Sequence, residues 1–316
     1  MQPCNFRARR QSRHSGDKAT PEPASTELLP PVIKRVLFLG DSITYSGQYT
    51  AYVEAYFATR FSTRRITFIN AGLPSETVSG LSEPNHADGQ FPRPVLRERL
   101  ARLLEKIKPD LILACYGMND GLYMSFDCGR FKLFCEGMEQ LHNVVTANGT
   151  KIIHLTPPYF DGVKNNNPAY VETMARYSKW LVVQHALGWN VIDINGSMTN
   201  YIVERRKTQS NFVFAADGIH PDDFGHWMIA KAILLGLGAF DVKDMTDVKQ
   251  MVSVISNSEK ILALIKQREE LMRDAWLAEI GHNRPGILRG LPLVEANTEA
   301  MKIGTLIEAL QSKATG

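Results

Sequence analysis

Two short polar segments of this chain contain residue types that could together cleave an ester bond. A glycine-aspartate-serine run ends at Ser42, and a second segment places Asp217 three residues before His220. Asp217 could orient His220 and stabilise its cationic form, while the other ring nitrogen accepts the proton of a serine nucleophile. Each segment also has a purely structural interpretation, because serine and aspartate are common helix-capping residues. The residue types alone leave both interpretations open.

Two further segments could stabilise the negative charge that develops on a carbonyl oxygen during such a reaction. Asn119 could donate a side-chain N–H to that oxygen, and residues 70–77 could donate a backbone N–H to it. Glycine and asparagine also favour turns, so Asn119 could equally mark a turn. The chemistry therefore depends on whether the fold brings these segments together.

The elements that must position these residues follow from the alternation of apolar and amphipathic runs. Short apolar runs predict β-strands, and the helical spacing of apolar residues between them predicts α-helices. This alternation is typical of a parallel sheet covered by helices on both faces. The predicted strands are residues 33–39, 66–70, 111–115, 151–155 and 190–194. The predicted helices are residues 49–59, 94–107, 131–147, 169–185 and 222–237.

Three of the polar segments directly follow predicted strands. Ser42 comes after the first strand, residues 70–77 begin at the end of the second, and Asn119 comes after the third. His220 lies just before the last helix that would cover the sheet. Open parallel sheets bind ligands beyond the carboxyl ends of their strands, so we expect these segments to meet at one edge of the sheet.

The strand pattern stops near residue 240, and helical patterns replace it. Residues 244–280 predict a helix with a break near residue 257, and residues 298–310 predict a last helix. Residues 1–31 are rich in arginine, proline and serine and contain too few apolar residues to order themselves. We therefore divide the chain into a disordered tail (1–31), an α/β domain (32–240) and a helical C-terminal extension (241–316).

The order of these polar segments along the chain resembles that of the SGNH, or GDSL-type, hydrolases. The resemblance runs from about residue 33 to residue 238, roughly two-thirds of the chain. It implies a flavodoxin-like three-layer α/β/α sandwich with a parallel sheet, and a serine esterase that needs no metal and no cofactor. Carried over by position, it implies that Ser42 is the nucleophile, and that Asp217 and His220 complete a catalytic triad. It also implies that the Asn119 side chain is a donor in the oxyanion hole.

The second block of the family pattern departs from its usual form in this chain. The family has a glycine two residues before a threonine or serine, and this sequence has Ser75 before Thr77. A backbone N–H survives any side chain except that of proline, so we expect the N–H groups of Ser42 and Ser75 to complete the oxyanion hole. Gly72 is the alternative donor.

The substrate that we expect is a short-chain ester, of the O-acetyl type, of a carbohydrate or another small polar alcohol. Aromatic residues beside the strand ends, Tyr45, Tyr116 and Tyr159, could line its binding site, or they could pack in the core. Residues 79–93 form a loop long enough to act as a lid. Residues 282–286 could fold back so that Arg284 contacts the substrate. The alternatives are a lysophospholipase or thioesterase-type acyl hydrolase, and a catalytically idle domain of the same fold that binds glycans.

Composition and motif content argue against several other classes of protein. The net charge of +3, from 36 Lys and Arg against 33 Asp and Glu, is too small to indicate a nucleic-acid partner. No apolar run approaches the roughly 18 residues of a transmembrane helix. The chain lacks a G-x-S-x-G nucleophile elbow, a P-loop and an H-E-x-x-H zinc motif. The sequence does not indicate an oligomeric state.

The cysteine content and the N-terminus bear on the compartment. Four cysteines do not make a disulfide scaffold in a chain of 316 residues, although Cys128 and Cys135 could pair. The N-terminus shows no apolar core of a signal peptide, so we expect a cytoplasmic protein. Export is the alternative if the true start of translation lies elsewhere.

Overall fold

A computed structural model describes residues 28–313 of the chain. Most of the predicted tail, residues 1–27, lies outside the described residues. The last part of that tail is described, and it packs onto the protein. Leu29 is buried, and the Arg64 guanidinium donates a hydrogen bond of 3.1 Å to the carbonyl of Pro30.

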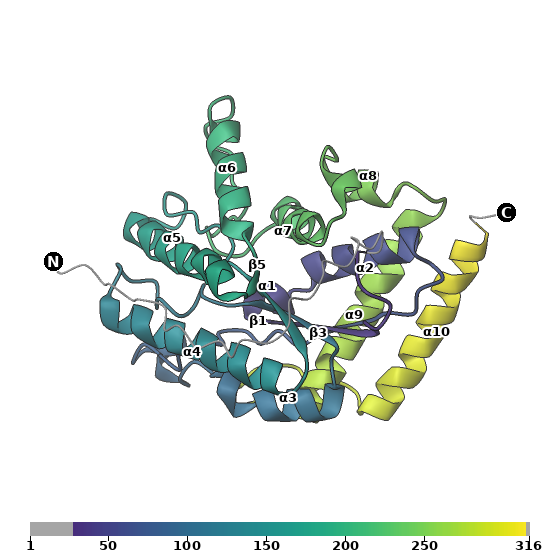
Figure 1. Cartoon of the computed structure of the whole chain (residues 1–316), viewed down its shortest axis with the longest axis horizontal. Coiled ribbons are helices and arrows are strands. Elements are labelled where there is room, and N and C mark those ends of the chain that lie inside the picture. Colours follow the sequence, from purple (N-terminus) through teal and green to yellow (C-terminus); the bar gives the residue numbers. More distant parts are fainter. Residues whose placement is uncertain (1–27, 314–316) are drawn as a thin grey trace, which may run out of the picture.

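Five parallel strands form one sheet at the centre of the fold, as the sequence predicts (Figure 1). The strands are β1 (Arg35–Gly40), β2 (Thr67–Asn70), β3 (Leu111–Cys115), β4 (Lys151–Leu155) and β5 (Asn190–Ile192). Their order across the sheet is β2-β1-β3-β4-β5, which makes β1 an interior strand. In the register, Gly40 lies opposite Cys115, so β1 and β3 end at the same level. The segments that follow these two strands therefore emerge side by side.

Helices cover both faces of the sheet and make three layers, which confirms the predicted α/β/α sandwich. Helices α3 and α4 lie on one face, and α2 and α7 lie on the other (Figure 1). The helices between β1 and the C-terminal extension include α2 (Gln48–Arg60), α3 (Leu100–Ile107), α4 (Cys128–Ala147), α5 (Pro168–Val183), α6 (Ile194–Arg206) and α7 (Asp223–Gly236).

Two local features differ from the sequence prediction. Helix α6 is absent from the predicted elements, and it begins at Ile194, where the fifth strand was expected to end. The reason is Asp193, whose side chain accepts a hydrogen bond from the Gly196 N–H and so starts a helix. Cys135 is a free thiol buried in α4, so the alternative pairing of Cys128 with Cys135 is wrong.

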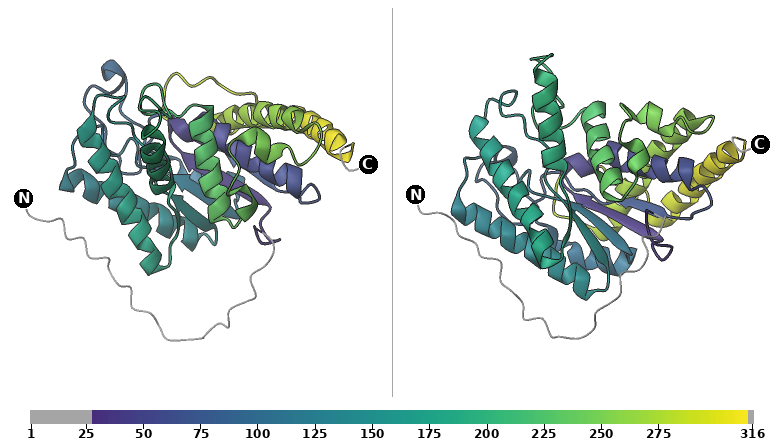
Figure 2. Two further views of the ribbon diagram at one scale, coloured as in Figure 1. Left: turned by 90° about the horizontal axis from the view of Figure 1, so that it is seen from above. Right: turned by 45° about the horizontal axis from the view of Figure 1, so that its top comes forward.

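The C-terminal extension consists of α8 (Val248–Val252), α9 (Ser258–Ile280) and α10 (Leu293–Ser312). The predicted break near residue 257 is present, because α9 begins at Ser258. Helix α9 packs along α2 and along the edge strand β2, and α10 packs against the outer side of α9 (Figures 1 and 2). The extension thus covers one edge of the sheet.

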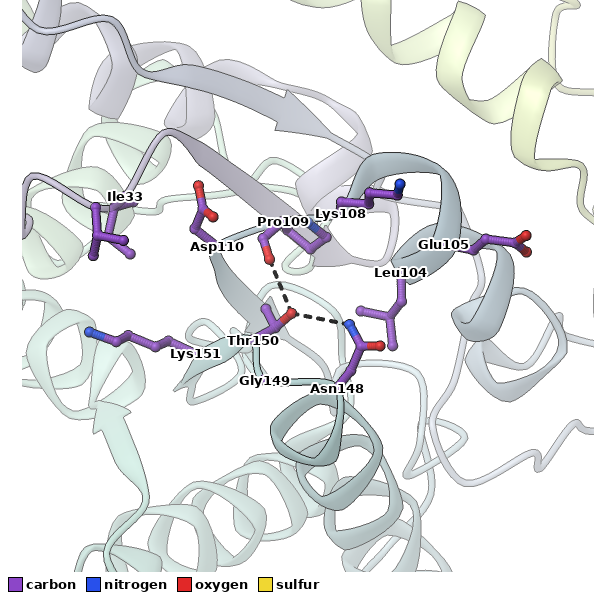
Figure 3. Close-up of a pocket in the computed structure, with 11 residues that line it drawn as sticks. Ile33, Leu104, Glu105, Lys108, Pro109, Asp110, Asn148, Gly149, Thr150 and Lys151 are labelled. Atoms are coloured by element: carbon purple, nitrogen blue, oxygen red, sulfur yellow. Dashed lines mark hydrogen bonds between the residues drawn. The ribbon is translucent and has the colours of Figure 1, made fainter.

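A surface hollow of about 530 Å³ lies at the amino ends of the strands (Figure 3). Ser42 follows the carboxyl end of β1, at the opposite edge of the sheet. The segments before β3 and β4 line the hollow, and they are joined by a hydrogen bond of 3.0 Å from the Thr150 hydroxyl to the Pro109 carbonyl. Parallel sheets of this kind bind ligands at the opposite, carboxyl, edge. The candidate site therefore has to be sought at the other end of the strands.

A buried ion pair holds the loop of residues 70–77 at the carboxyl edge. Both Glu76 carboxylate oxygens accept hydrogen bonds of 2.6 Å from the Arg99 guanidinium, and neither side chain is accessible to solvent beyond 1%. The Tyr116 hydroxyl donates a third hydrogen bond, also of 2.6 Å, to Glu76. The same guanidinium donates to the carbonyl of Ala71 at 2.8 Å. The buried Arg99 guanidinium thus binds two residues of the loop, Ala71 and Glu76.

Removal of the Glu76 carboxylate should therefore destabilise the fold strongly. We expect Glu76→Ala to lower the free energy of unfolding by about 3–5 kcal/mol, because Arg99 would remain buried without its counter-charge. Urea denaturation measures this change. The matched control is Glu204→Ala, which removes an exposed pair with Lys207 and should cost about 1 kcal/mol or less. Equal losses in the two variants would contradict the structural role of the buried pair.

Candidate active site

Ser42 is the first residue of a one-turn helix, α1 (Ser42–Tyr45), that directly follows β1. Asp41 caps this helix, and its side chain accepts a hydrogen bond of 3.0 Å from the Ile43 N–H. Burial raises the pKa of the Asp41 carboxyl to about 7, against the effect of that hydrogen bond and of nearby His220. The N–H of Ser42 lies at the start of the helix, where backbone donors have no intrahelical acceptor.

Ser42, His220 and Asp217 form a continuous hydrogen-bonded series. The Ser42 Oγ lies 2.9 Å from His220 Nε2, and His220 Nδ1 lies 2.7 Å from Asp217 Oδ2. The sequence-predicted residues are therefore brought together in the predicted order. The side chains of His220 and Asp217 are 52% and 50% exposed, so the series lies open to solvent on the imidazole side.

The loop that carries His220 is organised by Asp217 itself. Its second carboxylate oxygen accepts the backbone N–H groups of Ile219 and His220, each at 2.8 Å. Gly218 has a φ of +79°, which a glycine adopts without strain and which lets the chain turn back on the carboxylate. Partial burial acts to raise the pKa of the Asp217 carboxyl. The hydrogen bonds from the His220 ring and the two N–H groups outweigh that effect and lower it.

Asn119 is buried, and its amide is held in one orientation by three neighbours. Its Oδ1 accepts hydrogen bonds from the Arg93 guanidinium at 2.9 Å and from the Tyr123 hydroxyl at 3.1 Å. Its Nδ2 donates to the carbonyl of Glu76 at 3.2 Å. One N–H of the amide is thus used within the protein, and the other has no acceptor among residues 28–313. A cation at Oδ1 polarises the amide and makes that N–H a better donor.

The role of Arg93 beside Asn119 is not visible in the sequence. Arg93 ends the long loop of residues 79–93, which is long enough to act as a lid. Two of its nitrogens donate hydrogen bonds of 2.7 Å to the Glu83 carboxylate, within the same loop, and a third reaches Asn119. The loop is therefore anchored at the candidate site through one arginine. A pairing over 26 residues leaves no local sequence pattern.

Ser75 has the backbone conformation that glycine usually supplies. Its φ is +70°, in the left-handed region that L-residues with a side chain enter only at a cost in free energy. Within the described residues, its N–H donates to no protein acceptor. The N–H of Gly72, the alternative donor, is already bonded to Asn70 Oδ1 at 2.9 Å. Of the two predicted donors, Ser75 is the one that remains available.

The remaining predicted residues lie in three different environments. Tyr116 is fully buried against Glu76, so it packs in the core and does not line a surface site. Tyr45 is half-buried under the guanidinium of Arg273, whose central carbon lies 4.0 Å from the ring centroid. Tyr159 is half-buried and packs edge-on against Phe214.

Arg284 folds back toward the loop of residues 79–93. Its guanidinium carbon lies 5.0 Å from the ring centroid of Phe91, which also contacts His86 edge-on. The segment of residues 282–286 thus touches the loop that holds Arg93. Contact of Arg284 with a substrate stays a prediction.

Two features of residues 28–313 concern metal ions and membranes. No group of three or more His, Cys, Asp or Glu side chains in residues 28–313 is placed to hold a metal ion. Within the same range, no helix is both long enough and apolar enough to span a bilayer.

Solved structures with a similar fold include hydrolases. A gut microbial diltiazem-metabolizing enzyme superimposes with a TM-score of 0.54 at 23% identity, over 67% of this chain and 49% of that one. A catalytic mutant of an acetylxylan esterase from Geobacillus stearothermophilus superimposes with a TM-score of 0.51 at 21% identity, over 65% of this chain and 94% of the esterase. The chain thus spans about half the length of the first protein and nearly all of the second. At these identities, the likeness shows the fold.

The family of the chain is shown by its sequence. No curated protein matches the chain at a significant level. The GDSL-like Lipase/Acylhydrolase family matches residues 38–228, which is more than half of the chain and includes Ser42, Asn119 and His220. The chain therefore belongs to the GDSL-like lipase/acylhydrolase family and is a hydrolase of ester bonds.

Proposed function

We propose that this protein is a serine esterase in which Ser42 is the nucleophile, His220 the general base and Asp217 the residue that orients His220. The observation that carries the proposal is the hydrogen-bonded series of 2.9 Å and 2.7 Å that joins the three side chains. The ionised carboxylate of Asp217 holds the proton of His220 on Nδ1, which leaves Nε2 free to accept the proton of Ser42.

The proposed reaction proceeds through an acyl-enzyme. As Ser42 Oγ attacks the ester carbonyl carbon, its proton passes to His220 Nε2 and the carbonyl oxygen becomes an oxyanion. The oxyanion accepts hydrogen bonds from the N–H groups of Ser42 and Ser75 and from the free N–H of Asn119. The C–O bond to the alcohol then breaks, and His220 protonates the departing oxygen. A water molecule, deprotonated by His220, releases the acid and restores Ser42.

We further propose that the substrate is a short-chain ester, of the O-acetyl type, of a carbohydrate or another polar alcohol. The support is the exposure of about half of the His220 and Asp217 side chains. The leaving alcohol departs on the side of the imidazole, because His220 has to protonate it. An open imidazole side accommodates a large, hydrated alcohol, such as a sugar unit within a chain.

Hydrolysis of p-nitrophenyl esters by the wild-type protein and by Ser42→Ala tests the proposal. We expect Ser42→Ala to lower kcat by a factor of about 10⁴ or more while the fold persists, and a fluorophosphonate to label the wild-type protein at Ser42. We expect acetate to be the preferred acyl group. A preference for chains of eight carbons or more would instead favour a lysophospholipase or thioesterase. Neither turnover nor labelling of the wild-type protein would favour an idle, glycan-binding domain.

Replacement of the Asn119 amide should affect the transition state more than substrate binding. We expect Asn119→Ala to lower kcat by a factor of about 10²–10³ with little change in KM, because the oxyanion loses a preorganised donor. Steady-state kinetics measures this split. The control is Asn195→Ala, whose amide donates to the carbonyls of Pro157 and Pro158 outside the series. An unchanged kcat in Asn119→Ala would reject the role of Asn119 as a donor.

Replacement of Ser75 by glycine should leave catalysis intact and stabilise the protein. Glycine keeps the backbone N–H and adopts a φ of +70° without strain, so we expect Ser75→Gly to raise the free energy of unfolding by about 0.5–1 kcal/mol. We expect kcat to stay within about twofold of the wild type. Urea denaturation and ester hydrolysis measure the two effects. A large loss of kcat in Ser75→Gly would show that the hydroxyl, and not the N–H, takes part in the reaction.

A further inference from the structure

Two ionisable residues of α9 are buried close to the turn that carries Ser42. Glu269 and Arg273 lie one helical turn apart, and they are 8% and 7% exposed. Glutamate and arginine are almost never buried to this degree unless they are paired. Both belong to the C-terminal extension, beyond residue 228, where the family match ends. Their partners therefore indicate what the extension contributes.

Glu269 holds the amide of Asn70, the last residue of β2. The Glu269 Oε1 accepts hydrogen bonds from Asn70 Nδ2, at 2.9 Å, and from the hydroxyl of Thr50. The same Asn70 nitrogen donates to the carbonyl of Thr44 at 2.7 Å, and Asn70 Oδ1 accepts the N–H of Gly72. The amide thus links α1 to the loop of residues 70–77. The two N–H groups of the Asn70 amide thus have different acceptors: one donates to the Thr44 carbonyl and the other to Glu269.

Arg273 reaches the same short helix from the next turn of α9. Its guanidinium donates a hydrogen bond of 2.8 Å to the carbonyl of Tyr45 and lies over the Tyr45 ring. Its Nε donates to Asp274 at 2.8 Å, so the cation is paired within α9. The carbonyls of Thr44 and Tyr45 are the last two of α1, where the regular hydrogen bonds of a helix end. The Thr44 carbonyl also accepts the N–H of Gly47 at 3.1 Å. Both carbonyls accept a hydrogen bond from a group that α9 orients or supplies.

A helix of one turn is not stable by itself, because the cost of nucleating it exceeds the gain from its few hydrogen bonds. The contacts at the end of α1 therefore determine, together with the end of β1, where Ser42 lies. We infer that the esterase needs α9 to position its nucleophile. In this inference, Glu269 and Arg273 are positioning residues that fix α1, and with it the Ser42 hydroxyl, relative to His220. This inference rests on the proposed function of Ser42.

The protonation of Glu269 determines which variant tests the inference most cleanly. Burial raises the pKa of the Glu269 carboxyl to about 8, against the hydrogen bonds from Thr50 and Asn70. The group is therefore mostly neutral at pH 7, and glutamine reproduces both its shape and its acceptor oxygen. Glu269→Gln is the conservative variant, and Glu269→Ala removes the contact.

The chain offers a matched control in a second buried carboxylate that contacts α9. Glu54, on α2, is 7% exposed and pairs with Arg268, and none of its hydrogen bonds reaches α1. Glu54→Ala thus removes a carboxylate of similar burial and disturbs the contact between α2 and α9, but leaves the contacts of α1 unchanged. A purely structural role of Glu269 predicts the same behaviour for Glu54→Ala and Glu269→Ala.

The first measurement is p-nitrophenyl acetate hydrolysis at a temperature well below the unfolding transition of every variant. We expect Glu269→Ala to lower kcat by about 10- to 100-fold with KM within about twofold, because a small displacement of the nucleophile slows the chemical step. We expect Glu269→Gln to restore kcat to within about threefold of the wild type, and Glu54→Ala to stay within the same range. Equal losses of kcat in Glu269→Ala and Glu54→Ala would overturn the inference.

The second measurement is hydrogen exchange of the backbone amides of α1, which requires no activity. The N–H groups of Tyr45, Ser46 and Gly47 donate to the carbonyls of residues 41, 42 and 44. We expect these amides to exchange about tenfold faster in Glu269→Ala than in the wild type and Glu54→Ala. Unchanged exchange in Glu269→Ala would also overturn the inference.

The two measurements separate the inference from the proposed function. A wild-type protein without any ester turnover contradicts the proposed function, and the exchange rates still decide whether α9 holds α1. If Glu269→Ala does not fold, Arg273→Lys replaces it. Lysine keeps the charge but loses the planar guanidinium that stacks on Tyr45, so the same fall in kcat and the same faster exchange are expected.

Discussion

One hydrogen bond, between Ser42 Oγ and His220 Nε2, joins two segments that lie 178 residues apart, and the geometry of the site depends on it. Neither partner is held by the other. Ser42 is placed by the end of β1, an interior strand, and by the contacts that hold α1, whereas His220 is placed by the loop that precedes α7. Helix α7 packs against α2, the helix that follows Ser42 along the chain. The distance of 2.9 Å therefore reports how α2, α7 and the sheet pack as a unit.

Buried polar contacts hold several of the groups that surround the nucleophile. The buried ion pair of Glu76 and Arg99 holds the loop of residues 70–77 in place, and Arg93 fixes the orientation of the Asn119 amide. Each of these charges is costly to bury, and each is acceptable only when its partners are all in place. Such networks allow fewer alternative arrangements than apolar side chains, whose contacts have no preferred direction. Polar burial thus gives the proposed oxyanion-binding groups a defined position.

The sequence was sufficient to predict the sheet, the covering helices and the meeting of four polar segments, for physical reasons. Apolar runs reveal strands because both faces of the sheet are covered, and parallel strands bring the segments after them to one edge. Contacts that depend on a distant partner were not predictable. Glu269 meets Asn70 over 199 residues, and Arg273 meets Tyr45 over 228 residues. The φ of Ser75 is likewise set by the loop around it and not by a preference of serine.

The dependence of side-chain contacts on distant partners also explains why the sequence offers Tyr116 as a candidate for the lining of a surface site. It follows β3 directly, as a residue of a binding site would, but its complete burial and its bond to Glu76 show that it points into the core. Position at a strand end predicts that a residue is near the site, whereas the direction of its side chain depends on tertiary partners. Ser42 and Asn119 differ from Tyr116 in this respect, because each keeps one N–H, that of the Ser42 backbone and the second one of the Asn119 amide, without an acceptor among residues 28–313. A polar group that the fold orients but does not satisfy is the physical mark of a group available to a ligand.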